Sequence, residues 1–233
     1  MIVLGVETAT PQSSVALGSE RGLIASVLLA GVAHQEAVVP ALQHLLEWSE
    51  AELSQVGGVA VGIGPGLFTG LRVGVETAKT LAQVLRVPIV GLNSLDVLAY
   101  SVRYTQKLVG AVIDGRRGEV FYATYRTAPG GVMRMSDYAV GTAGRLVGEL
   151  QAKGNEVLLV GNGALLYRRE LEELGSKVEF ASATLAHPLA SSLVELAIPR
   201  FIREEADRLF DVVPLYLRKS DAEIAWDQRA RGA

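Results

Sequence analysis

The same order of predicted elements occurs twice along the chain. Residues 2–6 form an apolar run that ends at the acid Glu7, and residues 108–113 form a second run that ends at Asp114. Two strand-like segments follow each run, and helical and strand-like segments then alternate. A buried strand, a hairpin and alternating helices and strands predict a sheet covered by helices. The repeat therefore predicts two α/β units.

Two three-stranded meanders, each followed by helix–strand units, are typical of two ribonuclease-H-like domains separated by a cleft. This is the architecture of actin, Hsp70 and the sugar kinases, the ASKHA fold. The polar segment 103–107 separates the two copies, so we place the domains at 1–104 and 105–233. We expect a helix at about 189–204 that is interrupted by Pro199 and could pack back on the first domain. The polar segment from Lys219 onward is expected to fray.

Composition limits the function classes. The 233 residues are 49% hydrophobic, which is enough for two cores, and the formal net charge is -3. A protein that holds RNA alone usually has a basic balance, so another molecule is expected to hold most of any RNA. The absence of cysteine excludes disulfides, thiolate chemistry and cysteine-ligated zinc. The N-terminus lacks a signal-peptide pattern, and no run reaches ~18 apolar residues, so we expect a cytoplasmic protein without a membrane span.

A glycine-rich segment, GPGLFTGLRVG at residues 64–74, joins a predicted strand to a predicted helix. Backbone amides at such a junction can bind an anion, so Gly64 and Gly66 are candidate phosphate contacts. The alternative is a tight loop that lets the helix lie close to the sheet. No Lys-Ser/Thr pair follows the last glycines, so the segment is not a Walker A loop.

The turns after the two acid-ended strands are candidate nucleotide sites. In sugar kinases and Hsp70-like ATPases, acids at such turns organise metal and phosphates across the cleft. Glu7, Thr8 and Asp114 occupy these places, but neither turn has the full Asp-x-Gly-x-Thr pattern. The alternative, which we favour, is that the acids cap turns.

Histidine spacing does not indicate a metal site. His34, His44 and His187 are the only histidines, and no pair has the i, i+4 spacing that places two ligands on one helix face. We therefore expect each to be a surface or capping residue, and we identify no catalytic residue and no metal ligand.

Five segments resemble the TsaB (YeaZ) family and occur in the family's order along essentially the whole chain. In GPGLFTGLRVG, Leu67 replaces the usual Ser, and in LGVETAT, Glu7 replaces the usual Asp. The matching segments are LGVETAT at residues 4–10, His34-Gln35-Glu36 with the helix that follows, GPGLFTGLRVG at 64–74, DGRRGEVF at 114–121 and PLYLR at 214–218.

The resemblance implies a partner subunit. TsaB proteins pair with the related TsaD, which carries the catalytic metal, and act with the ATPase TsaE. The complex transfers a threonylcarbamoyl group to N6 of the adenosine at position ~37 in tRNAs reading ANN codons. Contact with tRNA is then indirect, and the chain alone is expected to form a homodimer. Where TsaD has metal-binding histidines, this chain reads Asn93-Ser94-Leu95-Asp96.

The first two predicted helices each carry a second apolar row beyond the stripe of roughly 100° that one core requires. We expect these rows to meet the equivalent helices of a partner in a four-helix bundle. The alternative is that both rows are internal. The expected contact residues are Val38, Leu42 and Leu45 in the first helix and Thr69, Val73, Glu76, Thr77 and Thr80 in the second.

Two other functions remain open. One is a nucleotide-binding regulatory module of the ASKHA type, in which ATP or ADP with Mg in the cleft controls partner affinity. The other is a glycoprotease-like metallopeptidase, although the chain lacks Cys and its histidines lack suitable neighbours. In the partner-subunit interpretation, we expect no cofactor bound at stoichiometric occupancy. ATP or ADP with Mg could then bind in the cleft or in the assembled complex.

Overall fold

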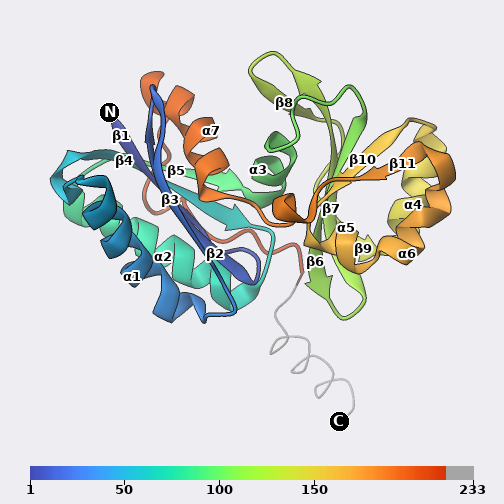
Figure 1. Ribbon diagram of the computed structural model, residues 1–233, viewed down its shortest axis with the longest axis horizontal. Helices are drawn as coiled ribbons and strands as arrows, with labels where there is room; N and C mark the ends of the chain where they lie inside the picture. Colours follow the sequence, from blue (N-terminus) through green and yellow to red (C-terminus); the bar gives the residue numbers. More distant parts are fainter. Residues whose placement is uncertain (219–233) are drawn as a thin grey trace, which may run out of the picture.

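Two mixed β-sheets form the framework of the protein (Figure 1). They are seen in a computed structural model, which describes residues 1–218. The segment from Lys219 onward, for which we predicted fraying, lies outside the described residues.

The first sheet has the strand order β3-β2-β1-β4-β5. The first three strands form an antiparallel meander, and β4 and β5 add parallel to β1 and to each other. In this register Val6 lies opposite both Val15 and Val61. The strands are β1 (Ile2–Glu7), β2 (Gln12–Ser19), β3 (Gly22–Ala30), β4 (Val56–Gly64) and β5 (Ile89–Asn93).

Helices cover both faces of the first sheet. The helices α1 (His34–Ser49) and α2 (Phe68–Leu85) pack on one face, against side chains such as Leu4. The helix α7 (Ala190–Ile202) packs on the other face, against side chains such as Val3. Successive strand residues point to opposite faces, so the buried run of β1 serves both cores.

The second sheet has the order β11-β10-β6-β7-β8, and β9 pairs with the start of β7. Its outer face is covered by α4, α5 and α6, and its inner face by α3, which lies between the two sheets (Figure 1). The strands are β6 (Leu108–Arg116), β7 (Glu119–Ala128), β8 (Gly131–Arg134), β9 (Ala139–Thr142), β10 (Val157–Val160) and β11 (Val178–Phe180). The helices are α3 (Ser94–Tyr100), α4 (Ala143–Lys153), α5 (Asn162–Leu166) and α6 (Arg168–Leu171), and the 3-10 turns are Leu53–Gln55, Glu172–Lys177 and Ala183–Leu185.

The predicted repeat is confirmed, because each sheet contains a three-stranded meander followed by parallel strands. Three details of the prediction are wrong. The sequence also predicts one strand at 131–138, but β8 ends at Arg134, β9 begins at Ala139, and the two pair with different parts of β7. It also predicts a helix at about 164–173, which divides at Tyr167, whose backbone (φ -100°, ψ 23°) leaves the helical region. Pro199 does not interrupt α7, which continues to Ile202 with Ala197 and Phe201 held in the core.

The chain returns to the first half after completing the second. The helix α7 packs on the first sheet, which is the option that the sequence left open. Beyond it, the Asp207 amide donates to the Ile89 carbonyl (2.9 Å) and the Leu215 amide donates to the Ile63 carbonyl (2.7 Å). The segment after α7 therefore runs along the first half before it reaches the second, where Leu217 packs on the core and Arg218 pairs with Glu119. Within residues 1–218, no helix is long and apolar enough to cross a bilayer.

Candidate functional site

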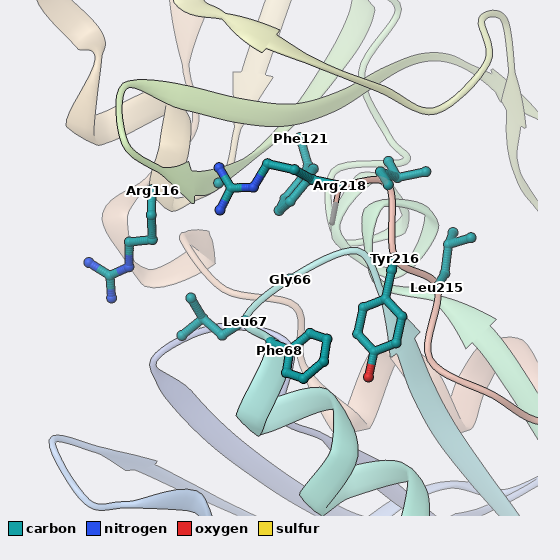
Figure 2. A pocket seen from close by; sticks show the side chains of 10 residues that line it. Gly66, Leu67, Phe68, Arg116, Phe121, Leu215, Tyr216 and Arg218 are labelled. Carbon is teal, nitrogen blue, oxygen red and sulfur yellow. The ribbon is translucent and has the colours of Figure 1, made fainter. Parts of the chain in front are cut away.

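A small pocket lies where the two halves meet, and three distant segments line it (Figure 2). The segments are the β4–α2 loop, the β6–β7 hairpin and the chain after α7. Each belongs to one of the five stretches whose sequence resembles a known family. The lining residues are Gly66, Leu67, Phe68, Gly115, Arg116, Phe121, Leu215, Tyr216, Leu217 and Arg218.

An aromatic and cationic cluster joins α2 to the C-terminal segment at this pocket. The rings of Phe68 and Tyr216 stack with their centroids 4.6 Å apart, and the Arg72 guanidinium lies 4.1 Å from the Phe68 centroid. The Arg72 Nε also donates to the Tyr216 hydroxyl (3.2 Å). Stacking and cation–π contact hold the two segments together at a partly exposed place.

The β6–β7 hairpin presents two arginines beside the same pocket. Arg116 and Arg117 have left-handed backbones, with φ of 63° and 55°, and Gly118 follows with φ of 79°. The Asp114 carboxylate accepts from the Arg116 amide (2.9 Å). The guanidinium of Arg218, in the C-terminal segment, donates to the Glu119 carboxylate of the hairpin (2.7 Å). A left-handed backbone costs a residue other than glycine about 1–2 kcal/mol. The hairpin therefore holds both arginines at a cost in stability.

The glycine-rich loop is packed against the β1–β2 turn. The Leu67 amide donates to the Ala9 carbonyl (2.7 Å), and the Thr8 hydroxyl donates to the Gly70 carbonyl (2.8 Å). A Cβ on Gly66 would overlap the Ala9 carbonyl group. The structure thus has the tight loop that we gave as the alternative to a phosphate site, and α2 lies against the turn as well as the sheet.

Glu7 is buried beneath this loop. Its Oε1 accepts from the Ala9 amide (2.8 Å) and its Oε2 accepts from the Ser94 hydroxyl (3.0 Å), while the carboxylate fills the space over Gly62. Burial raises the pKa of Glu7 to about 7, although the hydrogen bonds from Ala9, Ser94 and Thr8 lower it.

The structure does not bring the predicted phosphate contacts together. Glu7 and Thr8 are fully buried, and Asp114 is nearly so, with its carboxylate beside Arg116. Gly64 lies behind the pocket against the Leu215 carbonyl, so only Gly66 of the predicted set lines it. The pocket itself is about 110 Å³, below the ~300–1,000 Å³ typical of ligand pockets. In this conformation it is too small to enclose a nucleotide.

Comparisons with known proteins agree along nearly the whole chain. The protein-family model described as "TsaD: tRNA N6-adenosine threonylcarbamoyltransferase" matches residues 28–226. The TsaB protein of Bacillus subtilis, described as a tRNA threonylcarbamoyladenosine biosynthesis protein, is 31% identical over 97% of this chain and 98% of its own length. This chain belongs to the TsaB (YeaZ) family. The family is named for the biosynthesis of threonylcarbamoyladenosine in tRNA.

Solved structures support the TsaB-family fold. YeaZ from Pseudomonas aeruginosa superposes with a TM-score of 0.79 at 27% identity, covering 93% of this chain and 99% of that one. Component A of the (R)-2-hydroxyglutaryl-CoA dehydratase of Acidaminococcus fermentans superposes with a TM-score of 0.51 at 12% identity, covering 88% and 99%, and so shows the fold alone. The predicted ASKHA-type fold is confirmed.

The three histidines of this TsaB-family chain lie in separate places. His34 and His187 hydrogen-bond to Ser13 (2.7 Å) and Thr10 (3.0 Å), and burial lowers the pKa of both rings. His44 stacks on Trp48 with centroids 5.3 Å apart. Among the described residues, no three His, Cys, Asp or Glu side chains are grouped to hold a metal ion.

The expected partner surface is partly wrong. Val38, Leu42 and Leu45 are 1%, 6% and 0% exposed, because their i, i+4, i+7 row faces the first sheet. They cannot contact another subunit. In α2, Thr69, Glu76 and Thr80 are exposed, and Val73 and Thr77 are half-buried.

The structure also shows apolar surface residues on α1 and α2 that are not among the expected contact residues. Val39 and Trp48 of α1 and Val84 of α2 are exposed apolar side chains, with Trp48 74% exposed. They lie outside the apolar rows that cover the core, which is the signal that could have found them. Arg72, Tyr216 and Arg218 lie in segments that resemble the family, but the sequence does not show that they meet, because only the fold brings them together.

Proposed function

We propose that this chain is the non-catalytic partner subunit of a TsaD-containing complex. That complex transfers a threonylcarbamoyl group to N6 of the adenosine at position ~37 in tRNAs reading ANN codons, with the ATPase TsaE as a further partner. The observation that carries the proposal is a face of α2 on which Thr69, Glu76 and Thr80 are exposed and Val73 and Thr77 are half-buried. The role places the chain in the cytoplasm.

The uncovered face of α2 has the chemistry of a helix-packing surface. Thr69, Val73, Glu76, Thr77 and Thr80 recur at helical spacing, so they lie on one side of α2. The opposite side is buried against the sheet. Three of the five are threonines, and small side chains let a second helix approach closely.

A pair of neighbouring helices is also a suitable subunit interface. A specific complex buries about 800 Å² per partner, which a helix pair with its flanking side chains can supply. TsaD has a related sequence, so its equivalent helices would complete a four-helix bundle with α1 and α2. A second copy of this chain could occupy the same face when TsaD is absent.

The side chains at the start of α3 have structural partners in this chain. The Asn93 side chain accepts from the Leu95 amide (2.9 Å) and so caps α3. Asp96 accepts from the hydroxyls of Tyr125 and Tyr138, both at 2.8 Å. These bonds fix α3 to the second sheet. The arrangement supports assigning the metal and the chemistry to TsaD.

Val73→Glu tests the α2 face. A charge in the middle of a helix-packing surface is costly to bury, so we expect the variant to lose co-elution with the cognate TsaD on size-exclusion chromatography. The control is Leu166→Glu, which adds the same charge to an exposed apolar residue of α5 in the other half. Unchanged circular dichroism would show that both variants fold. Normal co-elution of Val73→Glu would exclude this face as the TsaD contact.

A further inference from the structure

We infer that the rim of the pocket between the two halves contacts RNA directly, so that this chain holds part of the tRNA itself. The inference rests on the proposed function only for the identity of the RNA. It concerns the β6–β7 hairpin, the C-terminal segment and the side chains of Phe68 and Arg72 at the start of α2, which adjoin Thr69 of the TsaD-facing side.

The first support is local charge. The three segments 64–74, 114–121 and 214–218 contain four arginines and two carboxylates, in a chain whose formal net charge is -3. Both carboxylates, Asp114 and Glu119, already form ion pairs with arginines of the cluster. Positive charge is therefore concentrated at the one place where these segments meet. All four cations are arginines, whose planar donor set suits phosphate.

The second support is the aromatic surface between the arginines. Tyr216 is 40% exposed, and its ring stacks on Phe68 below the pocket mouth (Figure 2). Arg116 and Arg218 extend beside the same mouth from the hairpin and the C-terminal segment. Aromatic rings that stack on bases, placed among arginines that bind phosphates, are typical of surfaces that bind unpaired RNA.

The third support is the strained hairpin. Asn and Gly adopt the left-handed backbones of this turn at lower cost than arginine does. Arg116 and Arg117 occupy them instead, and both are exposed. Strained backbone is concentrated at functional sites. A contact between the two guanidinium groups and a ligand accounts for arginine rather than Gly or Asn at these two left-handed positions.

A rim contact also agrees with the size of the pocket. A volume of about 110 Å³ does not enclose a free nucleotide, whereas an RNA strand needs only the rim and one exposed ring. An acidic protein surface could pair with the arginines, but it would not need the aromatic rings between them. We therefore commit to RNA.

The test is a titration of unmodified tRNA against the complex of the full chain with its cognate TsaD, at several salt concentrations. We expect Arg116→Gln/Arg117→Gln to weaken tRNA binding by about three- to tenfold and to reduce the salt slope by about 1–2, because phosphate contacts are lost. Tyr216→Leu is expected to weaken binding by about fivefold with the slope unchanged, because a stacking contact carries no counterion release. The matched control is Arg86→Gln at the far end of α2, which is also exposed and left-handed.

Two results would overturn the inference. In the first, the arginine double variant binds tRNA with the same affinity and the same salt slope as the wild type. The other is loss of TsaD or TsaE binding by that variant with tRNA binding unchanged, which would make the rim a protein contact. If no complex forms, the same titration with the chain alone decides the question. Failure of the proposed function appears instead as normal co-elution of Val73→Glu, so the two failures are distinguishable.

Discussion

The turns that follow β1 and β6 occupy the same place in the two copies of the fold, and each begins at a buried acid, yet they differ in how far they are exposed. The first turn is sealed. Glu7 and Thr8 are fully buried, and the glycine-rich loop covers them. The second turn is open, and its residues 116–118 are all exposed.

The difference shows that equivalent turns in the two copies of the fold can have different roles. The first turn became a support for the N-terminal end of α2, and α2 presents the proposed TsaD-facing side. The second turn became a projecting hairpin that carries two arginines in strained conformations. One copy therefore serves packing, and in our account the other serves binding.

The largest expected effect comes from forcing the sealed turn apart. Gly66→Ala places a Cβ on the Ala9 carbonyl group, so either the loop or the turn must move. We expect a loss of about 3 kcal/mol in the free energy of unfolding, measured by urea denaturation. The counterpart in the open turn is Gly118→Ala, where the Cβ meets open space and only the positive φ is strained. It should cost about 1 kcal/mol, and equal losses in the two variants would contradict the contrast.

The next effect concerns the charge inside the sealed turn. Burial raises the pKa of Glu7 to about 7, so between pH ~4.5 and ~7 the folded protein keeps a proton that the unfolded chain has released. The stability that Glu7 contributes is full below the unfolded pKa and is lost as pH rises through the folded pKa. We expect this loss to be about 3 kcal/mol between pH 4.5 and pH 8.

Glu7→Gln keeps the shape and the acceptor for the Ala9 amide but removes the titration. Urea denaturation at pH 5 and pH 8 should find the variant close to wild type at the lower pH and more stable at the higher. If wild type and variant respond identically to pH, the sealed carboxylate does not hold its proton.

The smallest effect is a gain in stability at the open turn. Arg117→Gly relieves a left-handed backbone and should raise the free energy of unfolding by about 0.5–1 kcal/mol. Arg86→Gly, at the C-terminal end of α2, relieves the same strain and should give a similar gain. Of the two, we expect only Arg117→Gly to weaken tRNA binding. A loss of stability in Arg117→Gly would show that the turn is not strained.

Much of the fold could be predicted from the sequence because its signals are local. Apolar runs ending in an acid located β1 and β6, and Asn93 is of a residue type that commonly caps a helix, as it does for α3. Short elements escaped prediction. The strand β11 has only three residues, and its place beside β10 is fixed by parallel pairing rather than by its own pattern.

The candidate site could be predicted only in part, because its contacts are remote in sequence. Arg72 and Tyr216 are 144 residues apart, and no spacing rule joins them. Helical periodicity gave two apolar rows in α1 but not which row faces the sheet, so Val38 was placed on the surface although it is buried. The tertiary packing of α1 against β2 and β3 decides that choice.

Reconstitution of the modification reaction tests the central claim most directly. Unmodified tRNA would be incubated with the cognate TsaD, TsaE, ATP and the threonylcarbamoyl donor, and modified adenosine would be measured by mass spectrometry. We predict product when this chain is present, and loss of product when the chain is omitted or replaced by Val73→Glu. Equal product without the chain would contradict its role as a required partner subunit.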